Sequence, residues 1–287
     1  MTGEMALDIL LDALKDSALV FAFVFLFHVL LSFFEAKLGN FLAKRKKTAP
    51  LFGSLFGLIP QCGTSVLGAD LYIEELIGMG TVIAIFLSCS DEAVIVLLVN
   101  GGDKAWTVLP LLGIKFVIGC LAGFLVEVVL AQKQTLKDAE YEGEQECHKH
   151  HHENTKLHAH LIHPLLHSLE LFAYVLLVNL ALGFLIGFVG EDNFVSFMTS
   201  SKYLGPLFGS LIGLIPNCAS SVLLSELFIN SSISFGTLAS GLLVNSGLGI
   251  MVLLRKKQTM KKAWIILGIC FGVAVTMGYL ICLVSGF

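Results

Sequence analysis

The sequence predicts an all-α membrane protein that crosses the bilayer many times and is built from two copies of one unit. Of its 287 residues, 56% are hydrophobic and 14% are charged, whereas a soluble domain carries roughly 25% charged residues. Residues 17–34 and 263–287 contain no Asp, Glu, Lys or Arg. Each of these runs is long enough to cross a hydrocarbon core of about 30 Å. The other observation behind this prediction is a long internal repeat.

The repeat is clearest in one apolar segment. Pro50-Leu-Phe-Gly-Ser-Leu-Phe-Gly-Leu-Ile-Pro-Gln-Cys62 returns 156 residues later as Pro206-Leu-Phe-Gly-Ser-Leu-Ile-Gly-Leu-Ile-Pro-Asn-Cys218. When the match is carried on to residues 98 and 254 without a gap, about half of the positions are identical. Paired segments interrupted by Gly and Pro are the best pointer in a membrane-protein sequence to a transport site.

Eight apolar segments are predicted to enter the membrane. They are residues 17–38, 51–68, 74–99, 106–130, 165–189, 206–224, 232–254 and 263–285. Residues 1–130 form a first membrane repeat and residues 165–287 a second, and a His-rich linker over 131–164 joins them. The correspondence extends to the last helix of each repeat, where Lys104-Ala-Trp106 is matched by Lys262-Ala-Trp264.

Loop charges predict that the two repeats have opposite orientations. In the first repeat the early loop, residues 44–47, is basic and the late loop, residues 100–104, is neutral. In the second repeat the early loop, residues 199–203, carries one lysine, and the late loop, residues 255–262, is strongly basic. Because Lys and Arg collect in short cytoplasmic loops, both basic loops and the linker are predicted to be cytoplasmic, and the N- and C-termini outside. Corresponding loops on opposite faces define an inverted repeat.

Two parses satisfy this orientation, which requires an odd number of crossings between residues 48 and 100. Three short crossings, at 51–68, 74–89 and 90–100, give ten spans in total. One re-entrant hairpin at 51–75 followed by one full span gives eight membrane segments, with each hairpin counted as one. Non-helical backbone at membrane depth is tolerated only inside protein or beside a water-filled cavity. Both parses therefore place the Pro-x-Cys segments in the interior.

The two Pro-x-Cys segments are the predicted transport site. Proline breaks or kinks a helix because it lacks the backbone donor, and the residues that follow each break carry amide, thiol and hydroxyl groups. Thiolate and oxygen donors together suit soft or borderline cations. In the structural alternative, these side chains only satisfy the carbonyls that the kink frees. The predicted substrate-binding residues are Pro60, Gln61, Cys62, Thr64, Ser65, Pro216, Asn217, Cys218, Ser220, Ser221, Asn245 and Ser246.

Asp91 and Glu92 are acids between two apolar runs, and the corresponding positions of the second repeat, Gly247 and Leu248, are not acidic. Ionisable residues inside a span are costly, and their default interpretation is a functional site. We expect these two acids to coordinate the transported cation or to exchange a proton during transport. Alternatively, they are solvated in a short turn at the membrane surface. Lys115 either neutralises one of them or extends its ammonium to an interface.

The linker contains most of the histidines of the chain. Short His-rich tracts commonly bind metal, because neutral imidazole is a ligand for Zn, Ni, Cu and Co. We expect a cytoplasmic loop that collects or senses metal, and the alternative is a solvated linker without a specific role. The predicted linker ligands are His148, His150, His151, His152, His158 and His160.

No motif of a nucleotide-driven pump or of a hydrolase occurs. The chain lacks a Gly-x-x-x-x-Gly-Lys-Ser/Thr phosphate loop, a His-Glu-x-x-His zinc motif and a Gly-x-Ser-x-Gly elbow. We therefore expect a transporter rather than an enzyme, with no tightly bound cofactor and no nucleic-acid partner. Its expected partners are the lipid bilayer, a metal or metalloid substrate, and protons as a candidate coupling ion.

With its paired Gly-Leu-Ile-Pro-x-Cys segments, its Ser90-Asp91-Glu92 stretch and its His-rich middle loop, the chain resembles the ten-span heavy-metal exporters. Members of this bacterial family are described as manganese transporters or arsenic efflux proteins. The resemblance covers nearly the full length. It implies a multi-pass permease of the bacterial inner membrane, favours the ten-span parse, and makes Cys62 and Cys218 the substrate-facing positions.

The leading hypothesis is a secondary-active exporter of a divalent heavy metal, such as manganese or zinc, or of an arsenical. A first alternative keeps transport but changes the substrate to a small anion or organic solute, held by the freed amides of the broken helices. A second alternative is a non-transporting membrane metal sensor or scaffold, in which the His-rich linker is the active part.

Overall fold

The computed structural model describes residues 39–130 and 202–285, apart from gaps at 43, 46–47, 61–62, 91 and 217, together with isolated residues elsewhere. The His-rich linker, with all of its predicted ligands, lies outside the described residues, as do most of the predicted segments 17–38 and 165–189. The chain divides into two compact units, Met1–Asn40 with Glu140–Phe194 and Phe41–Ala139 with Val195–Phe287. Each unit contains parts of both sequence repeats.

In the first unit, the described aromatic residues come from the first predicted segment of each repeat. Phe21 stacks on Phe25, one helical turn further along, with ring centroids 6.2 Å apart. Phe21 also meets the ring of Phe172 edge-on, with centroids 5.8 Å apart. These contacts join segment 17–38 to segment 165–189.

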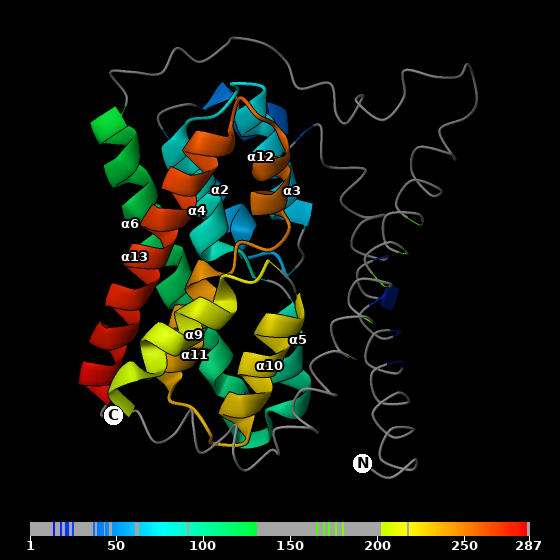
Figure 1. Ribbon diagram of the computed structural model, residues 1–287, viewed down its shortest axis with the longest axis vertical. Coiled ribbons are helices and arrows are strands. Elements are labelled where there is room, and N and C mark those ends of the chain that lie inside the picture. The colour runs from blue at the N-terminus through cyan, green and yellow to red at the C-terminus, as the bar shows by residue number, and fades with distance from the viewer. Residues whose placement is uncertain are drawn as a thin grey trace. The chain divides into compact units, whose positions relative to one another are not determined.

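In the second unit, the described helices follow the same order twice (Figure 1). The first repeat contributes α2 (Ala49–Gly57), α3 (Gly63–Ile73), α4 (Met79–Ser88), α5 (Glu92–Asn100), the 3₁₀ helix η1 (Gly102–Thr107) and α6 (Val108–Leu130). The second repeat contributes the 3₁₀ helix η3 (Lys202–Leu204), α9 (Gly205–Gly213), α10 (Cys218–Ile229), α11 (Phe235–Val244), α12 (Gly249–Arg255) and α13 (Met260–Ser285). Exchange of the repeats therefore maps α2–α6 onto α9–α13.

Proline and glycine set the limits of the short helices. Pro50 and Pro206 lie in the first turns of α2 and α9, where the missing N–H has no helical partner to lose. Both helices end shortly before the next proline, Pro60 or Pro216. At 1.5 Å per residue, a helix of nine residues is about 14 Å long, roughly half of a hydrocarbon core. Neither α2 nor α9 can cross a membrane alone.

Three helices among the described residues are long and apolar enough to span a membrane: Gly102–Val129, Phe235–Arg255 and Met260–Val284. They coincide with the predicted segments 106–130, 232–254 and 263–285. The second of them contains the break between α11 and α12. Length and composition thus support a multi-pass helical membrane protein.

The core of the second unit is formed by α4 and α11. Every residue of α4 is buried, and α11 is buried from Gly236 to Val244. α4 packs on α2, α3, α6 and α11, whereas α11 packs on α9, α10, α13 and α4. Short helices of one repeat pack on short helices of the other: α3 packs on α12, and α5 packs on α10. Consequently the two repeats interlock into one core.

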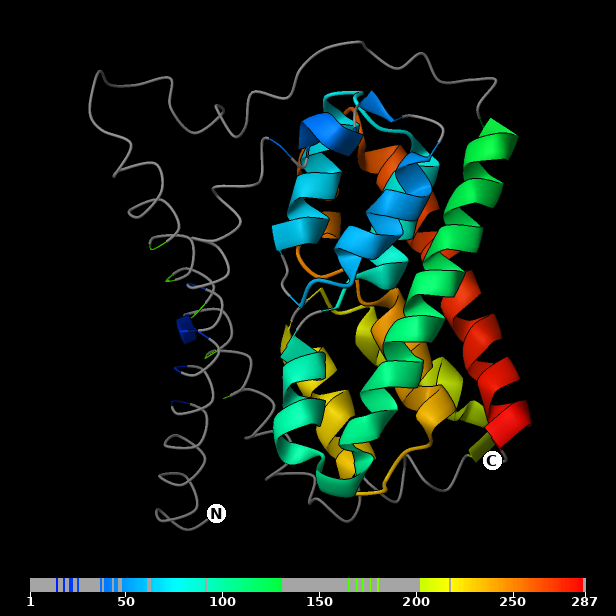
Figure 2. The ribbon, with the colours of Figure 1, turned by 180° about the vertical axis from the view of Figure 1, so that it is seen from behind.

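The halves of each repeat lie at different ends of this unit. In Figures 1 and 2, α2, α3, α4 and α12 lie in the upper half, and α5, α9, α10 and α11 lie in the lower half. The long helices α6 and α13 extend along both halves. α6 runs upward in Figure 1 and α13 runs downward, so these two corresponding helices point in opposite directions.

The buried faces of α6 and α13 have the same register. Val108, Leu111, Lys115, Gly119 and Gly123 on α6 are matched by Ala263, Ile266, Cys270, Ala274 and Gly278 on α13, with each pair 155 residues apart.

Within the helices, this register differs by three residues from the alignment that pairs the two Lys-Ala-Trp motifs. The reason is the entry to each helix: the first repeat enters α6 through η1, whereas α13 begins directly at Met260. Buried Lys115 and buried Cys270 are therefore at equivalent positions of the two repeats.

Lysines join the repeats at both ends of the unit. The Lys104 ammonium donates to the carbonyls of Phe228 and Ile229, at 2.8 and 3.0 Å, where α10 ends. The Lys262 ammonium lies 5.8 Å from the ring centroid of Tyr72, near the end of α3. Tyr72 and Phe228 occupy equivalent positions of the repeat. Each lysine therefore contacts the other repeat.

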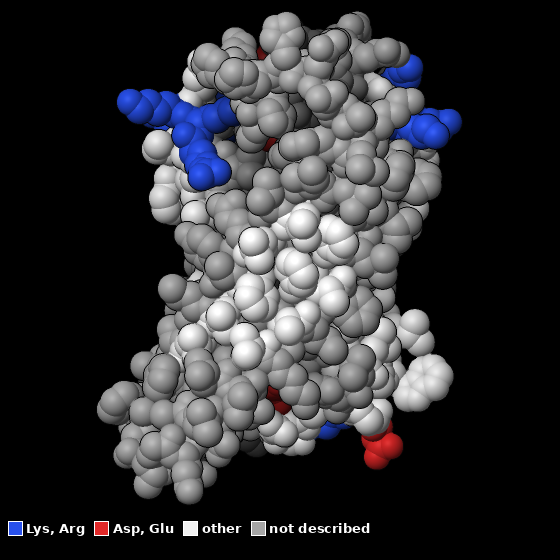
Figure 3. Space-filling view, turned by 90° about the vertical axis from the view of Figure 1, so that its right-hand side faces the viewer, with Lys and Arg blue, Asp and Glu red and all other residues white. Residues whose placement is uncertain are grey.

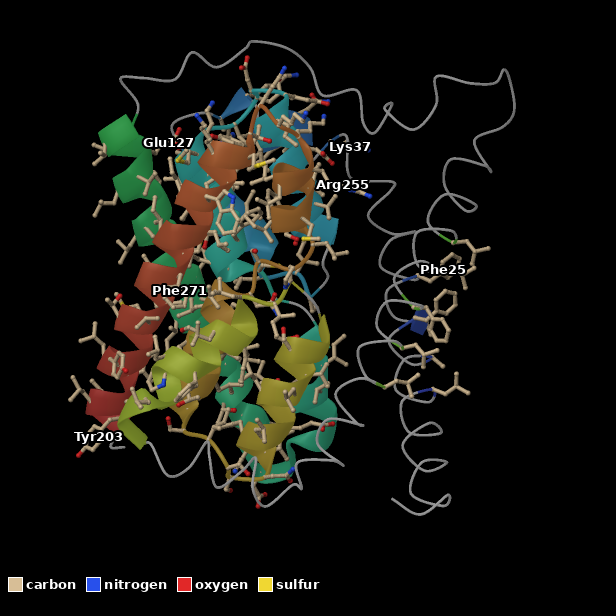
Figure 4. All side chains as sticks on the ribbon, viewed as in Figure 1. Phe25, Lys37, Glu127, Tyr203, Arg255 and Phe271 are labelled. Atoms are coloured by element: carbon tan, nitrogen blue, oxygen red, sulfur yellow. The ribbon has the colours of Figure 1, made fainter. Side chains whose placement is uncertain are left out.

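Charge is concentrated at the ends of the unit. The segment that leads into α2 lies at the same end as the basic loop 255–262, which joins α12 to α13, and Tyr203 lies at the other end (Figures 1 and 4). Figure 3 shows white surface between the blue residues at the top and the red residue at the bottom. The two loops that the sequence predicts to share one side of the membrane thus share one end of the protein.

Candidate transport site

The turn that follows α2 is paired with the break that follows α4. Pro60 forms an isolated parallel bridge with Ser90. The backbone N–H of Ser90 donates to the carbonyl of Gly57, the last residue of α2, at 2.8 Å. Gly57 is required here, because a Cβ at this position would collide with the Ser88 hydroxyl and lie 2.7 Å from the Ile85 carbonyl. Gly57 and Pro60 are thus held beside Ser90, in the break that follows α4.

The second repeat brings the equivalent segments together with different bonds. The Ser220 hydroxyl donates to the carbonyl of Ile215, across the turn that contains Pro216, at 3.1 Å. The side-chain amide of Asn245, at the end of α11, donates to the Ser220 hydroxyl at 3.4 Å. The Asn245 amide oxygen accepts from the backbone N–H of Gly247 at 3.0 Å. Asn245 therefore holds both the break and the neighbouring turn.

A direct bond links the two repeats beside these breaks. Ser65 in α3 is fully buried, and its hydroxyl accepts from the backbone N–H of Gly249 at 3.2 Å. Gly249 begins α12, and the first N–H groups of a helix have no partner within the helix. A side chain of the first repeat therefore satisfies the start of a helix in the second.

We expect Gly249→Ala to weaken the packing of α3 on α12. Alanine fits the helical backbone, but its Cβ would collide with the Ser65 carbonyl and lie 2.8 Å from the Phe86 ring. Because α12 has only seven residues and can shift as a unit, we expect a cost of about 1 kcal/mol. Hydrogen exchange of the α12 amides measures it. The matched control is Gly272→Ala on α13, where a Cβ meets nothing within 4 Å; equal exchange in both variants would contradict the prediction.

Lys115 connects the two breaks. Its side chain is 2% exposed although it lies in the middle of α6. Its ammonium donates to the carbonyl of Cys89, directly after α4, at 2.5 Å, and to the carbonyl of Leu242, in the last turn of α11, at 2.7 Å. The interpretation in which Lys115 extends to an interface is therefore wrong. The cause is the packing of α6 on α4, which directs this position into the core.

The predicted polar residues that the structure describes are all buried. They are Thr64 (3% exposed), Ser65 (0%), Ser220 (3%), Ser221 (0%), Asn245 (2%) and Ser246 (4%). Pro60 and Pro216 are half-buried. Gln61, Cys62, Asp91 and Asn217 lie outside the described residues. α5 begins at Glu92 and α10 at Cys218, but the description does not extend to the side chains of these two residues.

The residues that flank the two acids in the sequence are buried inside the second unit: Ser90 and Ala93 are each 1% exposed. Within the described part of the chain, no group of three or more His, Cys, Asp or Glu side chains is placed to hold a metal ion. The donors that the described residues bring to the breaks are hydroxyls, an amide and backbone carbonyls, which are oxygen ligands of hard and borderline cations.

The sequence analysis related Lys115 to Asp91 and Glu92 only as one of two alternatives, although a signal for a functional role existed. A lysine in the middle of an otherwise apolar span is costly, and a functional role is its default interpretation. The two carbonyls that it contacts were not predictable, because they belong to residues far away in the sequence. The site therefore includes a buried cation as well as the predicted polar side chains.

A family comparison covers almost the whole chain. The family described as "Putative, 10TM heavy-metal exporter" matches residues 2–191 and 169–286. The chain belongs to this family. The membership agrees with the resemblance carried by the Pro-x-Cys repeats and confirms that prediction. No curated protein and no solved structure matches this family member.

The family is described as one of heavy-metal exporters, and its ten-span description fits a multi-pass helical fold. In a membrane protein, irregular backbone in the interior is expected at a substrate site. This exporter-family protein has such backbone between α4 and α5, between α11 and α12, and at the turns that contain Pro60 and Pro216.

Proposed function

We propose that the chain is a secondary-active exporter of a divalent heavy metal, such as manganese or zinc, or of an arsenical, and that its cargo binds between the two helix breaks. The observation that carries the proposal is the convergence of these breaks, since one buried ammonium bonds to Cys89 after α4 and to Leu242 in α11. Broken helices whose free ends meet near the bilayer midplane form the substrate and ion sites of many transporters.

The two repeats have inverted topology in this proposal. Exchange of the repeats converts the contact of α3 with α12 into that of α10 with α5, and both contacts are present. The opposite directions of α6 and α13 support the same arrangement (Figure 1). The pairs α2–α3 and α9–α10 are then two re-entrant hairpins that enter from opposite sides. Alternating access would follow from movement of one repeat relative to the other around a fixed site.

The predicted ligands have separate roles. Cys62 and Cys218 supply thiolates, and Asp91 and Glu92 supply carboxylates that also couple transport to protons. The hydroxyls of Ser65 and Ser220 and the amide of Asn245 hold the surrounding backbone. The His-rich linker would collect or sense metal on the cytoplasmic side of a bacterial inner membrane. Trp106 and Trp264, 76% and 60% exposed at opposite ends, suit the two lipid interfaces.

Flux through the wild-type protein tests the function. The purified chain is reconstituted into vesicles and presented in turn with Mn²⁺, Zn²⁺, arsenite and small organic anions. We expect uptake or release of one of the metals or of arsenite, and empty vesicles provide the background. Flux of an organic anion alone would favour the anion alternative. A protein that moves none of these solutes would contradict the proposal.

We expect the pair Asp91→Asn and Glu92→Gln to remove the dependence of flux on a proton gradient. Both substitutions keep size and hydrogen bonding but remove the ionisable groups, and the second repeat offers only Gly247 and Leu248 at these positions. The measurement is metal flux at several pH gradients. Asp103→Asn, at an exposed end position, is the control and should behave as wild type. A double variant with an unchanged pH response would exclude the coupling role.

A further inference from the structure

The Lys115 ammonium lies at the ends of two helices that come from different repeats. The last four carbonyls of a helix have no partner within that helix, and the negative end of the helix dipole lies there. Leu242 belongs to the last turn of α11, and Cys89 follows α4 directly. Their oxygens accept from one Nζ atom at 2.7 and 2.5 Å. Two half-helix ends thus form a position for a cation.

The two repeats treat this position differently. The register of the buried faces places Cys270 of α13 where α6 has Lys115. Both side chains are buried, but only the first repeat supplies a positive charge. Backbone symmetry alone therefore does not require a lysine, since the other copy of the fold accommodates a thiol at the equivalent position.

Carbonyls at the ends of unwound or broken helices are also the groups with which transporters coordinate inorganic cations. A tethered ammonium bound to such carbonyls occupies the space and the ligands that a metal ion would use. Because the Lys115 ammonium is buried beside the breaks, its charge stays close to any ion that enters between them. The repulsion between two cations in such a site is far larger than it would be in water.

We propose that Lys115 is the resident cation of the transport site, and that a divalent metal binds the α4 and α11 carbonyls only when the ammonium leaves them. This inference rests on the proposed function, because it concerns the same site. Lys115 weakens metal binding and so permits release, and it keeps the two carbonyls bound to a positive charge when cargo is absent. It is a specificity-determining residue rather than a metal ligand.

Metal binding to a Lys115→Met variant tests the proposal. Methionine keeps most of the length of the side chain and removes its charge. We expect Zn²⁺ and Mn²⁺, each added alone to the full-length protein in detergent, to bind at least about tenfold more tightly than to wild type. Flux in vesicles should fall at the same time, because release becomes slow. The affinity is measured by calorimetry and by the rise in unfolding temperature with metal concentration.

The matched control is Lys104→Met. Lys104 also donates to carbonyls at a helix end, those of Phe228 and Ile229, but it does so at the end of the unit and away from the breaks. Its replacement should leave metal affinity unchanged. Equal affinity in wild type and Lys115→Met overturns the proposal. Weaker binding in Lys115→Met also overturns it, since that is the result for a lysine that only braces the fold or attracts an anion.

A measurement on wild type does not depend on the folding of a variant. With ¹⁵N-labelled lysine, saturating Zn²⁺ or Mn²⁺ should shift the side-chain signal of Lys115 and leave that of Lys104 in place. An unchanged Lys115 signal at metal saturation overturns the inference. In a second variant, Lys115→Ala, added propylammonium should raise the unfolding temperature and compete with the metal. Failure of the proposed function is distinct, because wild type would then neither bind nor transport either metal.

Discussion

Replacing both Cys62 and Cys218 by alanine is expected to reduce metal flux by about 100-fold or more, since loss of even an outer partner of a metal ligand costs 10–100-fold. α3 begins just after Cys62, and α10 begins at Cys218. The thiolate is the form of cysteine that binds metal, and the positive end of a helix dipole stabilises a negative charge nearby. Soft ions such as Cd²⁺ should be affected more than Mn²⁺, which prefers oxygen ligands.

The control for the double variant is Cys120→Ala. Cys120 lies on α6 and is partly exposed, so its loss removes a thiol from the membrane region without altering the Pro-x-Cys segments. Its flux should equal that of wild type. Retention of full flux by Cys62→Ala with Cys218→Ala, in protein that folds normally, would show that the thiols are not ligands and would leave the hydroxyl and carbonyl oxygens as the site.

Gly123→Ala is expected to destabilise the protein by about 1–3 kcal/mol, whereas Gly113→Ala on the same helix should be neutral or stabilising by up to about 1 kcal/mol. A Cβ at Gly123 would lie 2.6 Å from Ala84 Cβ and 2.8 Å from the Gly80 carbonyl. Both neighbours belong to α4, the rigid centre of the unit. A Cβ at Gly113 meets nothing within 4 Å, so only the better helix propensity of alanine remains there.

Thermal unfolding in detergent measures both glycine variants. The second repeat supplies an independent pair on α13: a Cβ at Gly278 would lie 3.0 Å from that of Pro206, and a Cβ at Gly268 meets nothing within 4 Å. Alanine at position 278 should lower the unfolding temperature, whereas alanine at position 268 should leave it unchanged or raise it. Similar unfolding temperatures for Gly123→Ala and Gly113→Ala would show that α4 and α6 are less closely packed than the structure describes.

The small residues near each crossing also explain how broken helices remain inside the membrane region. The Ser54 hydroxyl donates to the Phe116 carbonyl at 2.9 Å, and the Ser240 hydroxyl donates to the Pro206 carbonyl at 2.9 Å. Glycines such as Gly80 and Gly123 let the backbones approach, and small polar residues then bond across helices. Part of the sequence repeat therefore reflects the small residues that both copies need for close helix packing.

The Glu127 carboxylate shows that the two repeats need not use the same chemistry. It lies beside the backbone N–H groups of Gly80 and Thr81 at the start of α4, where a negative charge is favoured. At the corresponding start of α11, the Ser234 hydroxyl accepts from the Thr237 N–H at 3.3 Å and lies 3.3 Å from the Cys282 sulfur. Glycine at position 78 makes room for the carboxylate.

The sequence by itself determined the membrane class, the duplication and the position of the breaks. These properties depend on local composition: long runs without charge must leave water, and Pro60 and Pro216 end helices wherever they lie in the fold. The polar residues that it selected, including Ser65 and Asn245, are buried beside those breaks. Cys62 and Asp91 stay predictions, because they lie outside the described residues.

Only the tertiary structure decided which breaks meet and what lies between them. The exchange of α3 and α5 onto the other repeat, and the bonds from Lys115 to Cys89 and Leu242, join residues that are far apart in the sequence. The hydrophobic pattern cannot encode such pairs, since every apolar face is equally compatible with lipid and with another apolar helix. The helices that contact one another are determined by where glycines allow close approach and by which free carbonyls must be satisfied.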